Sequence, residues 1–247
     1  MNTKSTSKSL AILSYHKIGR SPENWESWFY IPEETFVDHL NFIQNEGWKV
    51  IDLSTFLLGL RNPECLPERA ILLTFDDGYR SLCEIALPWL RQYAFLAIVF
   101  MPTDYIGGQN DFDHGMEPDE AMCDWDHLRE LERGGVSIQS HGASHSRFST
   151  LSQRQQKEEL LQSKKVLENN LGNSVEVIAF PYGDCGNNPK EMKGMLERVG
   201  YRAACLYGGG PIHLPKFDPF RLERVAMGPD TNLKTTLHSS GMNSSNH

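Results

Sequence analysis

The chain has 247 residues, of which 39% are hydrophobic and 23% are charged, and its formal net charge is −8 at pH 7. These values are typical of a soluble globular protein with one sizeable domain or two small ones. The excess of acidic residues argues against a nucleic-acid partner and against charge-driven binding to an anionic membrane. The five cysteines are scattered without a Cys-x-x-Cys pair, which favours reduced thiols over a disulfide framework or a cysteine zinc site.

The N-terminus is polar up to Ser9, and the apolar run that follows, 10–13, is too short for the core of a signal peptide. No other run approaches the length of a transmembrane segment. The sequence as written therefore predicts a cytoplasmic protein.

Strand-like and helix-like segments alternate along the chain. The expected strands cover 10–13, 48–51, 71–75, 95–100, 136–139, 175–180, 201–205 and 222–226. The expected helices cover about 36–47, 54–60, 82–93, 125–133, 152–172 and 188–200. This alternation, with short connections and no linker, predicts one parallel α/β domain over 10–228. The number of units favours an incomplete (β/α) barrel of about seven parallel strands. The polar segment 229–247 is predicted to be a flexible tail.

Two loops stand out from this pattern. The first contains Trp25, Trp28, Phe29 and Tyr30, and such a concentration of aromatic residues outside a helix or strand indicates either a packed lid or a ligand wall. The second runs from 101 to 122, and loops of this length inside a compact domain are usually lids or substrate walls.

The strand at 71–75 ends in Asp76, Asp77 and Gly78. A short apolar run of this kind is typical of a buried parallel strand, and α/β folds bind their ligands at the C-terminal ends of such strands. The two carboxylates alone are ambiguous, because they could bind Mg²⁺ or Ca²⁺ or cap the helix that follows.

Two further strand ends carry unusual residues. His141 and His145 follow the strand at 136–139, and the segment 181–183 (Pro-Tyr-Gly) follows the strand at 175–180. In a barrel these strand ends and Asp76-Asp77 meet on one face. Two histidines and one aspartate form a facial set of ligands that suits Zn²⁺ or another divalent first-row ion.

The His-x-x-x-His spacing also occurs in the helical motif of zinc metalloproteases, which places a glutamate directly after the first histidine as the general base. Here that position is Gly142. The base must therefore come from elsewhere, and Asp76, next to the ligand Asp77, can supply it.

Taken together, the ordered segments 74–78 (Thr-Phe-Asp-Asp-Gly), 141–145 (His-x-x-x-His) and 180–183 (Phe-Pro-Tyr-Gly) resemble the first three motifs of the NodB-homology polysaccharide deacetylases, carbohydrate esterase family four. The similarity is closest to the poly-N-acetylglucosamine deacetylase branch, which also has an early Tyr-His pair, here Tyr15-His16, and a Trp-x-x-Leu-x-Glu-Leu helix, here 125–131. The resemblance spans about 10–227 and implies an incomplete (β/α) barrel.

The resemblance also implies a division of roles among the site residues. Asp76 is expected to be the general base and His16 the general acid, and the backbone N–H of Tyr182 is expected to stabilise the oxyanion. One divalent ion, Zn²⁺ or alternatively Ni²⁺, Co²⁺ or Mn²⁺, is expected at three ligands: Asp77, His141 and His145. Substrate contacts are expected from Pro181, Tyr182 and Trp125. The implied reaction is hydrolysis of an N-acetyl group on an amino sugar to a free amine and acetate.

The chain departs from the family pattern at two places. The third motif has an arginine two positions before its proline, where this chain has Ala179. Arg221 or Arg224 could replace it, or both could be ordinary arginines in surface salt bridges. The C-terminal Leu-x-His motif of other branches is not evident, and we interpret His213 and His238 as bystanders.

Three functions remain open on the sequence. The first is the deacetylation of an acetylated amino sugar. The second keeps the metal and changes the substrate, as in deformylation of an amino sugar or hydrolysis of a small cyclic amide. The third is a catalytically inactive glycan-binding protein. A retained base, three ligands and a candidate acid favour an enzyme. The oligomeric state is not readable from the sequence.

Overall fold

The computed structural model describes residues 8–214 and 217–238 of the chain. Its centre is a curved parallel sheet whose neighbouring strands run in the order β11-β1-β5-β6-β7-β8-β9. The bounds of these strands are β1 (Ser9–Tyr15), β5 (Arg69–Asp76), β6 (Ala97–Met101), β7 (Val136–Ser140), β8 (Val177–Ala179), β9 (Ala203–Cys205) and β11 (Val225–Ala226). The predicted incomplete barrel of parallel strands is therefore confirmed.

Two short strands extend the edges of this sheet. Strand β4 (Lys49–Val50) pairs in parallel with β5, and β10 (Ile212–His213) pairs antiparallel with β1. In the described part of the chain, the segment 222–226 lies between β9 and β1 and closes the barrel. Leu222 forms a single bridge to Cys205, and Val225 pairs with Leu13 of β1. No helix lies between β9 and this closing segment in the described residues, and the single bridge to Cys205 leaves the barrel incompletely closed at this point.

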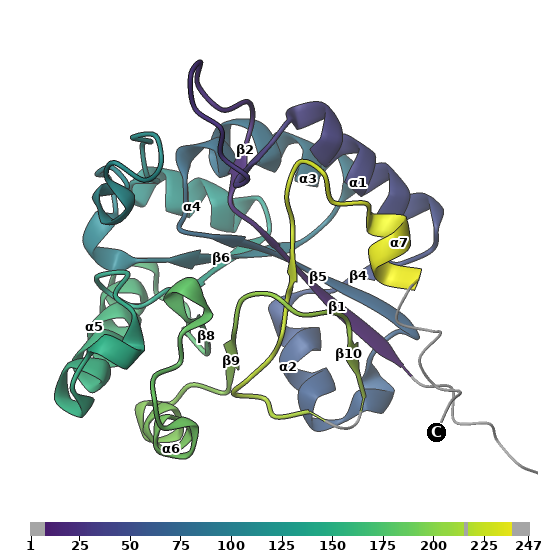
Figure 1. The fold of residues 1–247 in the computed structure, drawn as a ribbon. Helices are drawn as coiled ribbons and strands as arrows, with labels where there is room; N and C mark the ends of the chain where they lie inside the picture. Colours follow the sequence, from purple (N-terminus) through teal and green to yellow (C-terminus); the bar gives the residue numbers. More distant parts are fainter. Residues whose placement is uncertain (1–7, 215–216, 239–247) are drawn as a thin grey trace, which may run out of the picture.

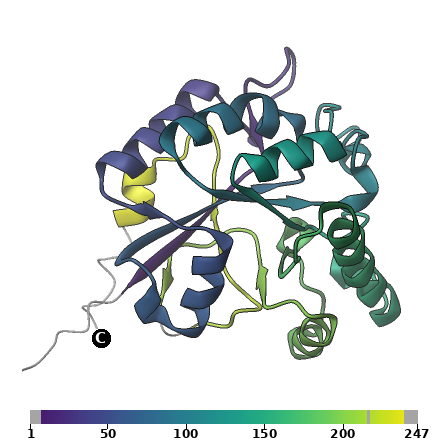
Figure 2. The same ribbon diagram turned by 180° about the vertical axis from the view of Figure 1, so that it is seen from behind.

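Helices surround the sheet on its outer face (Figures 1 and 2). Their bounds are α1 (Glu33–Asn45), α2 (Leu53–Arg61), α3 (Leu87–Tyr93), α4 (Trp125–Arg133), α5 (Gln153–Leu171), α6 (Pro189–Val199) and α7 (Leu233–His238). The local signals that predicted their ends are present: Ser152 and Gln155 form a capping box, and Gly172 and Gly200 have left-handed backbone at helix C-termini. Pro88 lies in the first turn of α3, directly after a π-helical turn (Leu82–Ala86), so it divides the predicted helix as expected.

Successive side chains along each strand point to opposite faces of the sheet, and both faces are apolar. One face packs against the outer helices, and the other forms a separate cluster that contains Leu10, Ile12, Leu72, Ile98 and Phe100. Continuing the same alternation toward the C-terminal ends of the strands, the inner face becomes polar at Ser14, Thr74 and Asp76, all of which are buried. The barrel interior is therefore apolar at one end and carries its polar groups at the end where the strands stop.

The described part of the predicted flexible tail, residues 229–238, contains a helix. Within the described residues, Leu233 and Leu237 are buried on helix α7, which lies beside α1 (Figure 1). Burial of two leucines explains why this stretch is helical, because packing of an apolar face stabilises short helices more than intrinsic propensity does. Residues 239–247 lie outside the described part of the chain.

Two loops rise above the C-terminal ends of the strands. Strands β2 (Lys17–Ile18) and β3 (Tyr30–Ile31) pair and join the two ends of the loop 19–29, which is dark purple at the top of Figure 1. The long loop 102–122 contains two 3₁₀ turns (Thr103–Tyr105 and Asp111–Asp113). Glu117 connects the two loops, because its Oε2 accepts hydrogen bonds from Lys17 Nζ at 2.9 Å and from Ser27 Oγ at 2.6 Å. Among the described helices, none has the length and hydrophobicity needed to cross a membrane.

Candidate active site

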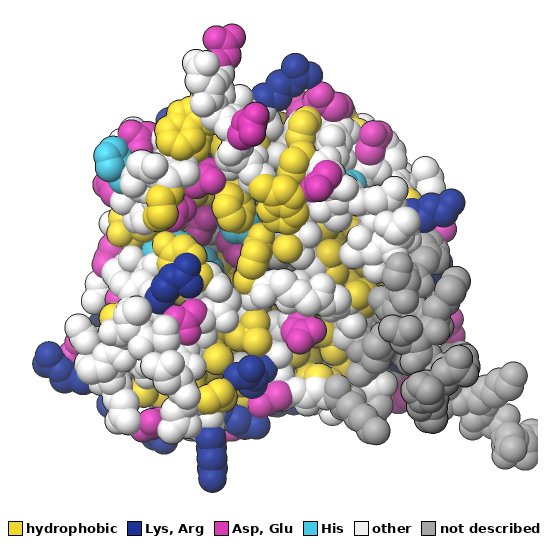
Figure 3. Space-filling model, viewed as in Figure 1, with side chains coloured by type: hydrophobic (Ala, Val, Ile, Leu, Met, Phe, Trp, Pro, Cys, Tyr) yellow, Lys and Arg dark blue, Asp and Glu magenta, His cyan; other side chains and the backbone are white. Residues whose placement is uncertain are grey.

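A cavity of about 250 Å³ opens at the C-terminal ends of the strands. In Figure 3, acidic and histidine side chains lie at the base of a hollow that hydrophobic side chains border. The lining residues come from seven separate segments of the chain: His16, Phe29, Asp76, Asp77, Tyr79, Asp113, His141, His145, Arg147, Phe180, Tyr182 and Tyr207. The predicted convergence of the three motif-bearing strand ends is therefore observed.

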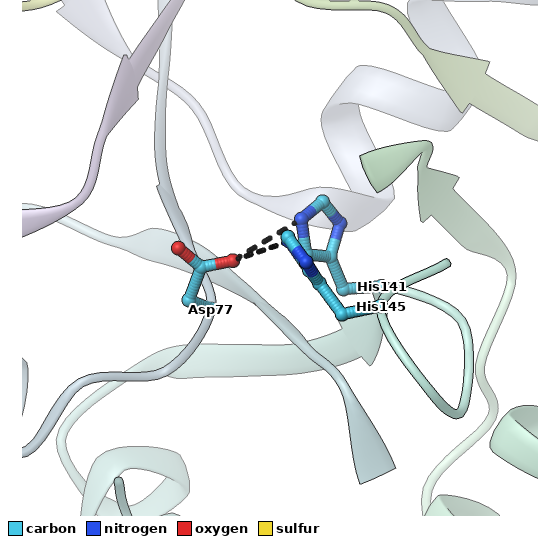
Figure 4. Close-up of side chains that lie close together, drawn as sticks. All are labelled: Asp77, His141 and His145. Carbon is cyan, nitrogen blue, oxygen red and sulfur yellow. Dashed lines mark ion pairs between the residues drawn. The ribbon is translucent and has the colours of Figure 1, made fainter. Parts of the chain in front are cut away.

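Asp77, His141 and His145 meet at the base of this cavity (Figure 4). All three side chains are buried, and their ligand atoms lie within 4.8 Å of one another. Asp77 Oδ1 lies 3.3 Å from His141 Nε2 and 3.1 Å from His145 Nε2. Tetrahedral coordination with bonds of about 2.0–2.1 Å separates ligand atoms by about 3.3 Å, so the observed spacing suits an ion of this kind.

The hydrogen bonds around these residues support the same conclusion. His141 Nδ1 lies 2.7 Å from the carbonyl oxygen of Ala179, and a neutral ring that donates this hydrogen bond presents an unprotonated Nε2 to Asp77. Asp77 Oδ1 has no hydrogen-bond partner among the described residues, although it is buried. Lone pairs of nitrogen and oxygen that face each other at this distance are stabilised by a cation between them. The residues present therefore fit a divalent metal ion.

The backbone at the site is unusual. Asp77, His145 and Tyr182 have positive φ angles of 67°, 55° and 57°. Left-handed backbone at residues other than glycine stores strain and is concentrated at functional sites. Gly78 follows with φ 78°, and a Cβ there would lie 2.2 Å from Met101 Sδ, so this turn requires glycine. The turn directs the Asp77 carboxylate back toward the two histidines.

Glu159, on helix α5, holds the loop between the two histidines. Its Oε2 accepts hydrogen bonds from the backbone N–H groups of Ala143 at 2.7 Å and Ser144 at 2.9 Å, and its Oε1 accepts one from Ser144 Oγ at 2.6 Å. One carboxylate thus fixes the backbone that separates His141 from His145. Sequence reasoning missed this residue, because a glutamate on an amphipathic helix has no distinguishing local signal.

Asp76 lies beside the metal ligands and is paired with Arg224. Arg224 Nη1 and Nη2 donate to Asp76 Oδ1 and Oδ2, each at 2.7 Å, and Ser14 Oγ donates to Oδ2 at 3.2 Å. Both partners of the ion pair are buried, and Arg224 has no exposed surface. Burial by itself raises the pKa of the Asp76 carboxyl, but the Arg224 guanidinium outweighs it and holds that pKa below its ordinary value. Asp76 is therefore ionised at neutral pH.

Of the two candidate arginines, Arg224 is therefore the one that pairs with the expected base, Asp76. Arg224 belongs to the closing segment 222–226, where its Nε also donates to the carbonyl oxygen of Leu206 at 2.7 Å. Arg221 is exposed and instead donates to Cys185 Sγ at 3.3 Å. The side chains of His213 and His238 lie outside the described part of the chain.

His16 follows β1 and lines the cavity. Its Nε2 lies 3.8 Å from Asp76 Oδ2, and its ring packs against Phe29 and Tyr207 with centroid distances of 4.8 Å and 5.6 Å. Burial lowers the pKa of His16, although the neighbouring carboxylate of Asp76 acts in the opposite direction. The imidazole is therefore mostly neutral at neutral pH in the free protein.

Tyr182 also lines the cavity and belongs to a 3₁₀ turn (Pro181–Gly183). Its ring packs against His145 at 4.7 Å, Arg147 lies over the ring at 4.0 Å, and its hydroxyl donates to Asp113 Oδ1 at 3.4 Å. The backbone N–H of Tyr182 belongs to the first turn of this short helix, where N–H groups have no acceptor within the helix. That N–H is therefore available to a ligand.

Comparison with known proteins identifies the family of this site. A model of the family described as "Polysaccharide deacetylase" matches residues 64–204, more than half of the chain. The chain belongs to the polysaccharide deacetylase family. Members of this family are metal-dependent hydrolases that cleave N-acetyl amide bonds, which agrees with the site described above.

Individual relatives of this polysaccharide deacetylase support the assignment. It is 27% identical over 220 residues to the YxkH protein of Bacillus subtilis (strain 168), covering 89% of this chain and 72% of that protein. It is 24% identical over 213 residues to a poly-β-1,6-N-acetyl-D-glucosamine N-deacetylase of Staphylococcus aureus (strain MRSA252), covering 83% of this chain and 65% of that enzyme. The chain thus spans just under two thirds of the length of the S. aureus enzyme.

Solved structures share the fold. The deacetylase PplD of Streptococcus pyogenes, in complex with acetate, superimposes with a TM-score of 0.80 at 23% identity, covering 94% of this chain and 99% of that one. IcaB from Ammonifex degensii superimposes with a TM-score of 0.76 at 21% identity, covering 90% and 93% of the two chains. The incomplete barrel of this polysaccharide deacetylase is therefore shared over nearly its whole length.

Two of the predicted substrate contacts are not found in the cavity. Trp125 is the first residue of helix α4 and packs against the core, and Pro181 is buried beside the loop at Gly142. In their place the structure adds walls that motif reasoning did not assign: Phe29, Tyr79, Asp113, Arg147, Phe180 and Tyr207. Two loops had given a signal: the aromatic loop around Phe29, for which a ligand wall was one of two interpretations, and the long loop 101–122, which contains Asp113 and was expected to be a lid or a substrate wall.

Proposed function

We propose that this polysaccharide deacetylase removes the acetyl group from N-acetylglucosamine residues of a glycan and releases acetate. The observation that carries the proposal is the position of Asp76, an ionised carboxylate held by Arg224 directly beside three converging metal ligands. Amide hydrolysis requires a base, an electrophile and an acid in one cavity. The relationship to a poly-β-1,6-N-acetyl-D-glucosamine N-deacetylase supports the choice of sugar.

The metal-binding residues in this proposal are Asp77, His141 and His145, and the ion that we propose is Zn²⁺. When bound, such an ion polarises a carbonyl group and lowers the pKa of water. The buried ligands and the fixed tautomer of His141 prepare the site for it. The second carboxylate, Asp76, is engaged by both Nη atoms of Arg224, so we assign it to proton transfer rather than to coordination.

We assign the two proton transfers to Asp76 and His16. Asp76 accepts a proton from the attacking water, because its carboxylate is ionised at neutral pH. His16 donates a proton to the nitrogen of the leaving amine. Since burial favours the neutral form of His16, the imidazole must gain this proton during the reaction, and Asp76 Oδ2 lies 3.8 Å from Nε2. The backbone N–H of Tyr182 donates to the developing oxyanion.

Acetate release is the direct test. The purified protein, loaded with Zn²⁺, is incubated with N-acetylglucosamine oligomers and in parallel with N-formylated sugars, and acetate and formate are measured. The proposal predicts acetate release that requires both Zn²⁺ and Asp76. If formate were the preferred product, the protein would be a deformylase and the proposed deacetylation would be wrong. Release of neither product by a protein that contains stoichiometric metal would contradict it in favour of a glycan-binding protein.

A further inference from the structure

A second hollow, of about 520 Å³, lies next to the active-site cavity on the loop 19–29. Two of its walls are Trp25 and Trp28, and each is 40% exposed, which is unusual for side chains of this size. The two hollows adjoin through Phe29, which lines the active-site cavity and packs edge-on against Trp28 with a centroid distance of 6.1 Å. The second hollow therefore adjoins the active-site cavity across the contact between Phe29 and Trp28.

The indole of Trp28 is fixed in place although it is exposed. Its Nε1 donates to Asp230 Oδ1 at 2.8 Å. The ring also packs directly on the backbone of Gly228, where a Cβ would lie 2.0 Å from Trp28 Cε2. Residues that are about 200 positions away in the sequence thus fix this aromatic ring in a position where part of it is exposed to solvent. Orienting a large ring costs conformational entropy and leaves apolar surface in water, which is typical of a preformed binding surface.

We propose that this hollow, with Trp25 and Trp28 as its aromatic walls, binds the sugar residues of the glycan chain next to the one that is deacetylated. This inference rests on the proposed function. The active-site cavity, at about 250 Å³, is smaller than the roughly 300–1,000 Å³ of sites for drug-sized ligands, so it holds about one sugar unit. The neighbouring units of a polymer must then lie on the surface outside it.

The chemistry of the hollow suits a sugar. A pyranose ring has an apolar face of C–H groups and an edge of hydroxyl groups, and the hollow combines indole rings with polar side chains such as Arg20, Ser21 and Glu26. An aromatic face with a few placed polar groups is the usual composition of a specific small-molecule site. A lipid surface suits it less, because Glu26 and Asp230 and the net charge of −8 oppose contact with an anionic membrane.

The test compares chain-length dependence in Trp28→Ala, Trp25→Ala and a matched control, Leu58→Ala, which removes a 51% exposed apolar side chain from helix α2. For each Zn²⁺-loaded protein, kcat/KM for acetate release is measured on an N-acetylglucosamine tetramer and on the monomer. We expect the tetramer-to-monomer ratio to fall about tenfold in each tryptophan variant relative to Leu58→Ala. Trp28→Tyr, which keeps an aromatic face, should recover part of this ratio.

Binding is measured separately, without turnover, by titrating chelator-treated protein with the tetramer and following tryptophan fluorescence. Affinity that depends on Trp25 or Trp28, with no acetate released by the loaded protein, would support the binding site while the proposed function fails. Acetate release with the same tetramer-to-monomer ratio in all variants would overturn the binding site while the proposed function stands. A third outcome would also overturn the glycan-binding site. If the protein bound vesicles of phosphatidylcholine and phosphatidylglycerol, and the tryptophan variants lost this binding but kept the tetramer-to-monomer ratio, the hollow would be a lipid-binding surface.

Discussion

Arg224 and Asp76, which are 148 positions apart in the sequence, form a buried ion pair. Nη1 of the arginine donates to Oδ1 of the carboxylate and Nη2 donates to Oδ2, each at 2.7 Å. The pair joins the segment that closes the barrel to the strand that carries the proposed base. Arg224 is also bonded to Thr74 Oγ1 at 3.3 Å and to the carbonyl oxygen of Leu206, so its position is fixed independently of Asp76. The segment that closes the barrel therefore also orients the Asp76 carboxylate.

Arg224→Met should lower both stability and activity. Breaking a buried pair by removing one partner costs about 3–5 kcal/mol, because the remaining charge stays buried without compensation. Arg224→Lys should recover less than half of that loss, since an ammonium group cannot form the two parallel bonds. The free energy of unfolding and kcat/KM are measured for both. Arg221→Met, which removes an exposed arginine three residues away, is the control, and equal effects at the two positions would contradict the assignment.

Substitutions at the site should distinguish the loss of catalysis from the loss of metal binding. Asp76→Asn is expected to retain the metal and to lose nearly all turnover, because an amide cannot accept the proton. His141→Ala is expected to lose both, since it removes a ligand. Elemental analysis of each purified variant gives the metal content beside the rate of acetate release. Release of the metal from Asp76→Asn would show that the division of roles between Asp76 and Asp77 is wrong.

His16→Ala should lower the rate of amide hydrolysis by a factor of about 10² to 10⁴, which is the usual contribution of general acid catalysis. The same variant should lose much less on an activated acetate ester, whose leaving group departs without a proton. The ratio of the two rates is the informative measurement. An equal loss on amide and ester would indicate that His16 shapes the cavity and does not donate the proton.

Glu159→Gln should weaken metal binding by about 10- to 100-fold, the usual effect of losing a hydrogen-bond partner behind a metal site. The amide keeps one acceptor for the backbone N–H groups of Ala143 and Ser144 but loses the charge that strengthens those bonds. Glu158→Gln is the matched control, because Glu158 is exposed on the same helix, 3.7 Å from Arg154. Metal affinity is measured by competition with a chromophoric chelator. Similar affinities for the two variants would exclude a positioning role for Glu159.

Metal should stabilise the folded protein. A ligand at 100 times its Kd adds about 2.7 kcal/mol when it binds only the native state, and a protein of this size should show this as a higher Tm. Adding Zn²⁺ to chelator-treated protein is therefore expected to raise Tm, and the increase should be absent in Asp77→Ala. An increase of the same size in Asp77→Ala would place the stabilising ion at a different site.

The alternation of apolar runs and helical periodicity was sufficient to predict a parallel α/β barrel, because hydrophobic period and cap residues are local properties of the chain. The same holds for Asp77, His141 and His145, since parallel strands end on one face and the three residues follow three strand ends. The partner of Asp76 could not be predicted in this way. Arg221 and Arg224 look alike in sequence, and only the register of the closing segment turns Arg224 into the barrel and leaves Arg221 outside.

Which residues line the cavity and the hollow beside it also depends on the tertiary structure. Trp125 belongs to a family motif yet packs into the core, whereas Phe29 and Asp113 reach the cavity from loops whose course depends on contacts such as that of Glu117 with Lys17. The exposed ring of Trp28 is held by Asp230 and Gly228, about 200 residues away. Local sequence determines which elements form and which residues stand at their ends. The side chains that meet across the barrel depend on register and loop packing, which are set by contacts between residues distant in the sequence.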